Sequence, residues 1–366
     1  MSASGEPPAW LHFLSPGFPS ANMVVADGGE RVLFDTGYGS DIGRTLDALA
    51  GAGVPPGALD LIVNTHWHSD HVGGNARLQS ELGIPIAAAL GDAELVNACD
   101  PGACLSEWLD QPVERYRVDR ALRPGDRLTA GRAEWDVLAT PGHTPRHLSF
   151  YQPEEELLLL GDAVHADDVG WLNVAVDGPE AIDDALRTVE SLSRLPVRLA
   201  LPGHGPAIED PPRAFAAAHA RYERMRADPQ RAGWHACKRI LAFALMIHDG
   251  IARDDLDAYL TGSPWLVDHA AAGVETTPES LAADLLAEMH RVGGVEERDG
   301  RLRCRTPYNR PPTGWLGGPG FPRDWLGPVV GPGRSAPTRG RPGRACPRPP
   351  AGGPRESRGD TRGRGR

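Results

Sequence analysis

The stretch THWHSDHVGG, residues 65–74, places three histidines and one aspartate within six residues. A short, mostly apolar segment, LDLIVN (59–64), precedes it, and a segment with helical spacing, GGNARLQSELG (73–83), follows it. The cluster is therefore expected at a turn from a strand into a helix. Turns at strand ends are where α/β folds place their chemistry.

Histidine and aspartate in this pattern favour a metal site. Zinc binds imidazole nitrogens and carboxylate oxygens, and a catalytic zinc leaves one position for water. In H-x-H-x-D-H, His66 and His68 can converge from one side of the turn, while Asp70 and His71 face a neighbouring point. Two ions about 3.5 to 4 Å apart would need roughly six or seven ligands, one of them bridging.

Four other strands are expected to end in a loop that holds one histidine or aspartate. RVLFDTG ends with Asp35, and AEWDVLATPGHT, EELLLLGDAV and VRLALPGHGP carry His143, Asp162 and His204. The last three bring the candidate ligands to seven. The isolated histidines are interpreted as ordinary surface or core residues, and they are His12, His219, His235, His248, His269 and His290.

The length of the chain predicts more than one structural unit. At 366 residues it exceeds the size at which a single core usually stops growing. No apolar run approaches the roughly 20 residues of a membrane span. The N-terminal MSASGEPPAWLHF has neither the basic start nor the apolar stretch of a secretion signal, so a cytoplasmic location without membrane contact is expected.

Charge is unevenly distributed along the chain. The net charge is −11, but residues 306–366 hold twelve arginines against three acidic residues, a surplus of +9 that leaves −20 for residues 1–305. Such an acidic body repels a phosphate backbone unless a local basic patch overrides it. Residues 306–366 are mostly Pro, Gly and Arg and are expected to be a disordered tail, either a nucleic-acid-binding arm or a segment without specific function.

The five cysteines show no C-x-x-C spacing, so neither a disulfide framework nor a zinc ribbon is expected. Cys99 and Cys104 are near enough in sequence for a bridge or a metal pair. Two unpaired thiols in a loop is the preferred interpretation.

Together these motifs resemble those of the metallo-β-lactamase-fold hydrolases, over residues from about 10 to 210. Asp35 in LFDTG, the THWHSDH block, His143 in TPGHTPRH, Asp162 in LLLGD and His204 in LPGHG stand in the order and spacing of that family. The resemblance implies an α/β fold, the αββα sandwich, in which two mixed sheets pack face to face with helices outside. A dinuclear metal site would lie at one edge of the sheets.

The resemblance also implies the ligands of two zinc ions, with iron or manganese as alternatives because N/O ligands discriminate poorly between metals. They are His66, His68 and His143 for one ion, Asp70, His71 and His204 for the other, and Asp162 as the bridge. Asp35 is expected to orient the histidine loop through hydrogen bonds. A water between the ions has a pKa lowered toward neutrality, and Asp70 would accept a proton from the bridging hydroxide as it attacks.

Two departures from the family pattern bear on function. The loop usually reads TPGHTPGH, and Arg146 replaces the second glycine, where it would meet either an anionic substrate or solvent. A zinc β-lactamase typically lacks the bridging aspartate, so Asp162 argues against antibiotic hydrolysis.

Residues 211–305 are expected to form a mostly helical domain after a catalytic domain at 1–210. Helices are predicted in PPRAFAAAHARYERMRA, KRILAFALMIHDG and TPESLAADLLAEMHRVGG, and a hairpin in VEERDGRLRCR. Three helices and a hairpin resemble the small winged-helix domain of some β-lactamase-like proteins. Its acidic residues favour a scaffold, a lid or a homodimer contact over nucleic-acid binding.

Three functions remain open. The first is hydrolysis of a small-molecule thioester or related ester, similar to glyoxalase II, which the THWHSDHVGGN motif and the acidic body favour. The second is an endoribonuclease or phosphodiesterase, because β-lactamase-like proteins with this extension include RNA-cleaving members. The third is a non-catalytic binding protein, which the intact ligand set disfavours. The sequence thus predicts a metal-dependent hydrolase and leaves its substrate open.

Overall fold

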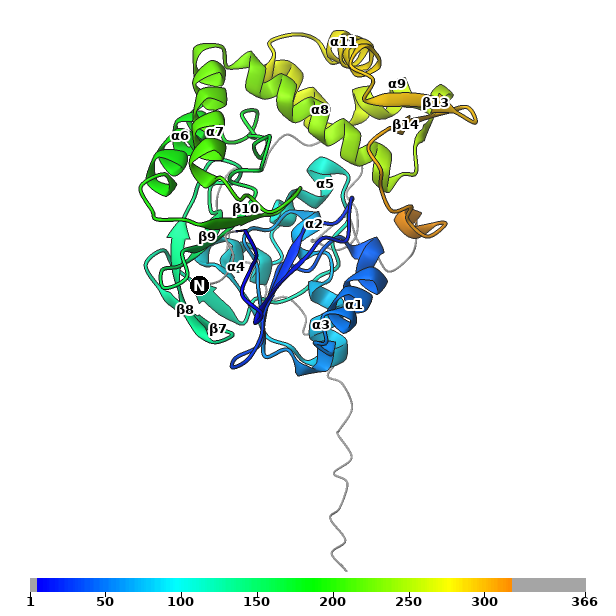
Figure 1. Cartoon of the computed structure of the whole chain (residues 1–366). Helices are drawn as coiled ribbons and strands as arrows, with labels where there is room; N and C mark the ends of the chain where they lie inside the picture. The colour runs from blue at the N-terminus through cyan, green and yellow to red at the C-terminus, as the bar shows by residue number, and fades with distance from the viewer. Residues whose placement is uncertain (1–4, 318–366) are drawn as a thin grey trace, which may run out of the picture.

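Two β-sheets packed face to face form the centre of the protein (Figure 1). The computed structural model describes residues 5–317. The first sheet has the strand order β1-β2-β3-β4-β5-β6, antiparallel as far as β3 and parallel beyond it. Its strands are β1 Leu11–Leu14, β2 Met23–Ala26, β3 Val32–Phe34, β4 Leu61–Val63, β5 Ile86–Ala89 and β6 Arg120–Leu122.

The second sheet has the order β11-β10-β9-β8-β7, and β10 and β11 are its parallel pair. Its strands are β7 Arg127–Ala130, β8 Ala133–Ala139, β9 Leu148–Gln152, β10 Leu157–Gly161 and β11 Leu199–Pro202. Strands β2 and β3 of the first sheet form a hairpin whose connection includes Asp27, Gly28 and Gly29.

Helices cover the outer face of each sheet. The first sheet is covered by α1 Ile42–Gly51, α3 Asn75–Leu82 and α4 Leu90–Asn97, and the second by α6 Glu180–Leu192 and α7 Pro211–Ala227. The short helices α2 Ser69–Val72 and α5 Ser106–Leu109 lie in connecting segments. The layers therefore run helix, sheet, sheet, helix, which confirms the expected αββα sandwich.

Side-chain alternation along the strands explains these layers. On β10, Leu157 and Leu159 pack between the two sheets, while Leu158 and Leu160 pack beneath α6 and α7. Successive residues of a strand point to opposite faces, so a continuous apolar run supplies two cores at once. The run LLLL in the sequence is therefore a strand buried on both faces.

A mostly helical C-terminal part follows the sandwich, as expected (Figure 1). Its helices and three-stranded sheet share one core. The elements are α8 Gln230–Ile247, β12 Ile251–Ala252, α9 Arg253–Gly262, α10 Pro264–Asp268, the π-helical turn His269–Gly273, α11 Pro278–Arg291, β13 Val295–Arg298 and β14 Arg301–Cys304. The predicted hairpin is confirmed, and Asp299 and Gly300 both have positive φ, as a two-residue hairpin turn requires.

Sequence patterns did not predict α9 and α10. Helix α9 is short and strongly acidic, and its buried residues are only Leu256 and Leu260. Two apolar positions in ten residues are too few to establish a helical period.

The packing of α7 bears on where the domain boundary lies. Phe215 and Tyr222 of α7 belong to the same core as α6 and the second sheet, whereas the C-terminal core takes its residues from α8 onward. The boundary expected after residue 210 stays a proposal, and this packing favours a position after α7.

Residues 306–317 contact the sandwich and the C-terminal part. Tyr308 donates a hydrogen bond to Asp249 at 2.9 Å, and Asn309 donates one to Asp41 at 3.0 Å. The ring of Trp315 lies 5.1 Å from that of Tyr38. The packed chain therefore extends into the segment expected to be a tail, and the rest of that segment, residues 318–366, lies outside the described residues.

The structure excludes a bridge between Cys99 and Cys104. Cys104, Cys237 and Cys304 are buried free thiols, so Cys104 forms no bridge with Cys99. Cys346 lies outside the described residues. Over residues 5–317, none of the helices combines the length and apolar character needed to cross a membrane.

Removing residues 306–366 should lower the melting temperature relative to removing residues 318–366 alone. The shorter deletion keeps the contacts of Tyr308, Asn309 and Trp315, and the longer one removes them. A loss of roughly 1 to 2 kcal/mol would lower the midpoint by roughly 2 to 8 °C. Thermal unfolding followed by circular dichroism measures both proteins, and equal midpoints would show that these contacts do not stabilise the fold.

Candidate metal centre

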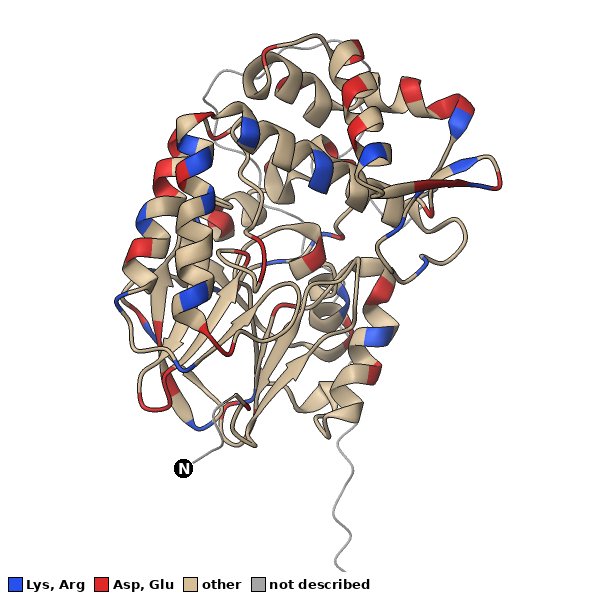
Figure 2. Ribbon diagram, turned by 45° about the horizontal axis from the view of Figure 1, so that its top comes forward, with Lys and Arg blue, Asp and Glu red and all other residues tan. Residues whose placement is uncertain are grey.

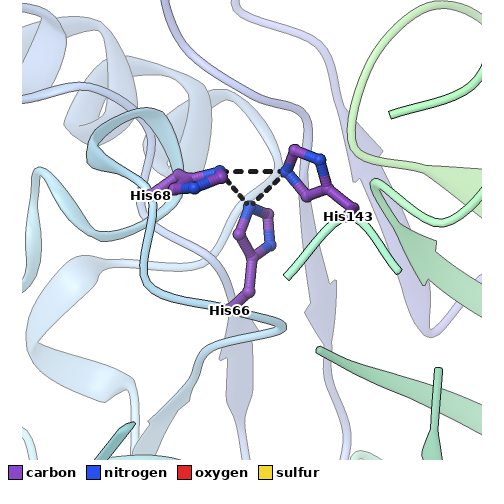
Figure 3. Close-up of side chains that lie close together, drawn as sticks. All are labelled: His66, His68 and His143. Atoms are coloured by element: carbon purple, nitrogen blue, oxygen red, sulfur yellow. Dashed lines mark hydrogen bonds between the residues drawn. The ribbon is translucent and has the colours of Figure 1, made fainter. Parts of the chain in front are cut away.

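Three histidines converge at the edge where strands of both sheets end. His66 and His68 follow β4, and His143 follows β8. Figure 3 shows their rings pointing toward one another. His68 Nδ1 lies 2.9 Å from His143 Nε2, and His66 Nε2 lies 3.2 Å from each of these atoms. Three ring nitrogens thus face a common point.

This triangle has the dimensions of a zinc site. Zinc–nitrogen bonds of about 2.0–2.1 Å at tetrahedral angles place ligand nitrogens about 3.3–3.4 Å apart. The observed separations are only slightly shorter. All three side chains are buried, and burial lowers the pKa of His68 to about 3 and that of His143 to about 4. Neutral imidazoles present lone pairs, which is the form that binds a metal.

Asp70, His71 and His204 form a second group beside the first. His204 Nε2 lies 3.0 Å and His71 Nε2 lies 3.8 Å from Asp70 Oδ2. Asp70 and His71 are in α2, directly after the first two histidines, and His204 follows β11. The H-x-H-x-D-H turn therefore supplies side chains to both groups, and His66 also lies within reach of His71 and Asp162.

Asp162, which follows β10, lies between the two groups. One carboxylate oxygen is 3.6 Å from His143 Nε2, and 3.6 Å from His204 Nε2, while the other is 3.4 Å from His71 Nε2. A Cβ atom on Gly203 would collide with Asp162 Oδ1 and approach the ring of His71 to 2.8 Å. The glycine after β11 is thus needed for the carboxylate to reach the centre.

Asp35 contacts the histidine loop rather than the centre of the donor groups. Its carboxylate accepts hydrogen bonds from Thr65 N at 2.9 Å, from Thr65 Oγ1 at 2.8 Å and from His71 Nδ1 at 2.7 Å. A proton fixed on Nδ1 leaves the Nε2 lone pair of His71 facing Asp70 and Asp162. The orienting role that the resemblance implied agrees with this geometry.

Two further hydrogen bonds fix the tautomers of the first group. His143 Nδ1 donates to the carbonyl of Trp171 at 2.7 Å. Thr65 Oγ1, whose proton goes to Asp35, can accept from His66 Nδ1 at 3.0 Å. In both rings Nε2 is then left without a proton and faces the shared point.

The second group carries the electrostatic signature of a cation site. Burial lowers the pKa of His71, but the carboxylates of Asp162, Asp35 and Asp70 outweigh it and raise the pKa well above the ordinary value. The pKa of His204 is raised in the same way, by Asp162 and Asp70 against burial. Protons on His71 and His204 balance the negative charge of the nearby carboxylates. A bound metal ion would balance the same charge, so metal binding would release these protons.

Orphaned polar atoms also fit a metal. His71 Nε2 and Asp162 Oδ1 are buried and have no hydrogen-bond partner among the described residues. Buried polar atoms are rarely left unsatisfied, because each costs about 1 to 3 kcal/mol. The donor set of imidazole nitrogens and carboxylate oxygens suits zinc, iron or manganese.

Sequence reasoning missed two histidines at this edge. His147 accepts a hydrogen bond from the backbone N–H of Asp162 at 3.0 Å and bonds Thr140 Oγ1 at 2.8 Å through its other nitrogen. His165 Nε2 lies 3.4 Å from Asp162 Oδ1. His147 was visible as the second histidine of TPGHTPRH, whereas His165 has no signal beyond its position three residues after Asp162.

Arg146 points away from the donor groups. Its Nε donates to the buried Asp92 at 2.6 Å, and its guanidinium lies 4.8 Å from the centre of the Trp67 ring. Burial raises the pKa of Asp92 to about 6, against the lowering effect of Arg146. The pair with Asp92 joins the loop of His143 to α4, and 35% of the Arg146 side chain remains exposed to solvent.

A model of the metallo-beta-lactamase superfamily matches residues 15–204, which is more than half of the chain. The protein therefore belongs to the metallo-β-lactamase superfamily, as the motifs predicted. The matched segment ends at His204, the last of the seven candidate ligands.

Individual relatives agree with this assignment. The hydroxyacylglutathione hydrolase of Hyphomonas neptunium is 32% identical over 136 residues, which cover 37% of this chain and 45% of that protein. The beta-lactamase-like protein 2 homolog of Caenorhabditis elegans is 27% identical over 191 residues, covering 51% and 56%. The chain thus spans about half the length of these curated relatives.

Among solved structures, a mutant of the metallo-β-lactamase from Cronobacter sakazakii superposes with a TM-score of 0.50 at 20% sequence identity. The superposition covers 61% of this chain and 96% of that one. A likeness at this level of identity shows the fold alone.

Replacing Asp162 and Asp35 should have different effects on metal content. Asp162→Ala removes the carboxylate that lies between the two groups, so we expect loss of one ion and of most activity. Asp35→Asn keeps the shape and an acceptor oxygen, so we expect full metal content at saturating zinc with turnover reduced roughly 10- to 100-fold. Elemental analysis and rates on the two variants form the test. Two tightly bound ions and near-normal turnover in Asp162→Ala would contradict a bridging role.

Proposed function

We propose that the protein hydrolyses a thioester or related ester at a dinuclear zinc centre. The observation that carries this proposal is the arrangement of seven buried or partly buried donors in two adjoining groups with one carboxylate between them. The proposed ligands are His66, His68 and His143 for one ion, Asp70, His71 and His204 for the other, and Asp162 for both.

Bound zinc ions would supply a water of lowered pKa and a polarised substrate carbonyl. The residues of this chain hold that chemistry in place. Asp35 keeps His71 in the required tautomer, and His147 holds the backbone of Asp162. Asp162 spans the two donor groups and offsets positive charge at the centre.

Asp70 is proposed to take the proton of the attacking water. Its carboxylate reaches the cavity above the centre and lies 3.0 Å from His204 Nε2. The water oxygen adds to the acyl carbon, the carbon–sulfur or carbon–oxygen bond of the substrate breaks, and the leaving group receives the proton. One water and one thioester or ester give one carboxylic acid and one thiol or alcohol.

The named relatives support the choice of a thioester. Several of the similar curated proteins are hydroxyacylglutathione hydrolases, at 31 to 33% identity over parts of the chain. The position of Asp162 between the two donor groups also favours a thioester over a β-lactam, because the sequence pattern of zinc β-lactamases typically lacks this aspartate. Antibiotic hydrolysis is therefore not proposed.

The alternative is cleavage of RNA or another phosphodiester. Its support is the helical extension with a hairpin that follows the sandwich, the arrangement that resembles a winged helix. Figure 2 shows basic and acidic positions interspersed along the outer helices in this view. Nucleic-acid binding requires basic residues that follow the phosphate backbone. This distribution supports the thioester over RNA.

Location and assembly stay predictions. A cytoplasmic location rests on the sequence alone, and a homodimer contact through the C-terminal part rests on the acidic residues of that part.

The protein purified without chelator and supplied with zinc should contain about two metal ions per chain. Two donor groups with one shared carboxylate are expected to hold two ions, and iron or manganese would substitute because the ligands are nitrogen and oxygen. Inductively coupled plasma mass spectrometry measures the ratio. A value near zero after remetallation would contradict a metal centre, and a value near one would contradict the dinuclear assignment.

The zinc-loaded protein should cleave thioesters faster than phosphodiesters or RNA. The test is a panel of acyl thioesters, acyl esters, lactones, bis(p-nitrophenyl) phosphate and short single-stranded RNAs, with Asp162→Ala as the control for contaminating activity. Cleavage of RNA with no cleavage of any ester would establish the alternative instead.

A further inference from the structure

A cavity of about 330 Å³ opens directly onto the proposed metal centre. Both donor groups reach it, because His68, Asp70, Asp162 and His204 all line it. Small-molecule sites typically have volumes from about 300 to 1,000 Å³, so this one suits a compact substrate. The nature of its other walls determines which part of a substrate it can accept.

Aromatic rings flank the centre on two sides. The ring of Phe18 stacks on that of His204, with centroids 5.1 Å apart and 12° between the planes. Trp171 stacks on His68 in the same manner, at 5.3 Å and 8°. Both aromatic side chains also line the cavity. A substrate that reaches the centre therefore passes between apolar surfaces.

Helix α8 supplies another wall of the cavity. Ile240, Ala242, Phe243 and Met246 line the cavity, together with Arg239 at the edge. These positions are spaced by one, three, four and seven residues, which places them on one face of the helix. We call this set the cavity face of α8. It is apolar except for Arg239.

Arg239 is not free to bind an anion. Its guanidinium forms an ion pair with Asp168, which also pairs with Arg221 at 3.0 Å and with His235 at 3.4 Å. Burial raises the pKa of Asp168, but His235, Arg239 and Arg221 outweigh it and hold the pKa well below its ordinary value. Asp168 therefore stays charged and retains Arg239.

The remaining charge of the lining is negative. Arg239 is the single Lys or Arg among the described residues that line the cavity, and Asp167 adds an exposed carboxylate. Gln111 and Thr306 add neutral polar groups. A carboxylate or phosphate placed beyond the centre would meet no unpaired cation there, and an unpaired buried charge is strongly disfavoured.

We propose that the acyl group of the substrate is apolar and uncharged, and that the cavity face of α8 limits its length. This inference rests on the proposed hydrolysis of a thioester or ester and names the kind of acyl group that the site accepts. The apolar chain would lie between Trp171 and the cavity face, with its carbonyl at the metal centre. Substrates whose acyl group ends in a carboxylate would be poor.

Two half-buried positions on α8 allow the volume of the cavity to be changed without leaving a void in the hydrophobic core. Ala242 is half-buried, so Ala242→Phe fills space in the cavity. Phe243 is also half-buried and contacts the ring of Tyr38 at 5.5 Å, so the milder Phe243→Leu enlarges the cavity while keeping an apolar contact. Ala216 lies exposed on α7, outside the lining, and Ala216→Phe is the matched control.

The test is kcat/KM for a series of straight-chain acyl thioesters from acetyl to dodecanoyl. In the wild type we expect a rise of roughly fourfold per added methylene until the chain fills the cavity. Ala242→Phe should reduce kcat/KM for the best long substrate at least tenfold more than it reduces kcat/KM for the acetyl substrate. Phe243→Leu should move the optimum to longer chains, and Ala216→Phe should reproduce the wild type.

A carboxylate-ended substrate tests the charge argument. A succinyl thioester should be at least tenfold poorer than the butyryl thioester of similar length. Equal rates for these two, a profile independent of chain length, or Ala242→Phe matching the wild type on long chains would each overturn the inference. Thermal unfolding and zinc content of every variant separate a cavity effect from misfolding.

Calorimetric binding of octanoate and acetate separates this inference from the proposed reaction. Octanoate should bind the zinc-loaded wild type at least tenfold more tightly than acetate, and Ala242→Phe should abolish the difference. Tighter binding of octanoate than of acetate, without cleavage of any thioester, would overturn the proposed reaction and support the apolar cavity. Cleavage of thioesters at rates independent of chain length, together with equal affinities for octanoate and acetate, would overturn the apolar cavity and support the proposed reaction.

Discussion

Buried nitrogen and oxygen donors at one sheet edge need a compensating positive charge, and the surrounding structure serves that need. Asp70 and Asp162 are buried beside five imidazoles that face one another. In water-free surroundings such groups repel or stay unsatisfied unless protons or metal ions lie between them. The raised pKa of His71 and the lowered pKa of His68 show the two ways in which the protein alone meets this requirement.

The sandwich supplies the rigidity that such an arrangement requires. Every donor lies either in the loop that follows a strand of the sandwich or in the short helix α2 after β4. Strands that end at one edge bring side chains together that are up to 138 residues apart in sequence, from His66 to His204. Hydrogen bonds from Asp35 and His147 then fix the orientation of the donors.

Much of this arrangement could be predicted from the sequence, because it depends on local patterns. The strand ends at Asp35, His143, Asp162 and His204 follow apolar runs with clear boundaries, and the histidine cluster is a dense motif. The role of His147 could not be predicted, since it depends on the antiparallel pairing of β8 with β9 beside the end of β10. The partner of Arg146 lies 54 residues away, and nothing local indicates it.

The helices and the hairpin of the C-terminal part could largely be predicted from the sequence, but the position of this part beside the cavity could not. Helix α8 was visible in the sequence as an apolar helical segment, but its place in the wall of the cavity beside the donors depends on tertiary packing. The periodic apolar pattern of a helix is the same whether its apolar face packs on a core or borders a cavity. The ion pairs of Asp168 with Arg221 and Arg239 join the loop after β10 to α7 and α8, and so fix the helix over the centre.

All the candidate metal donors precede α8 in the sequence, and this order matters during synthesis of the chain. The last donor, His204, precedes the wall of the cavity that needs α8 and closes with Thr306. At synthesis rates of about 5–20 residues per second, the intervening hundred or so residues emerge over roughly 5–20 s. During that interval the strands that carry the donors would all be synthesised while the cavity still lacks α8. The donors would then stay open to water until α8 packs beside them, so a metal ion could enter before the apolar wall of the cavity is in place.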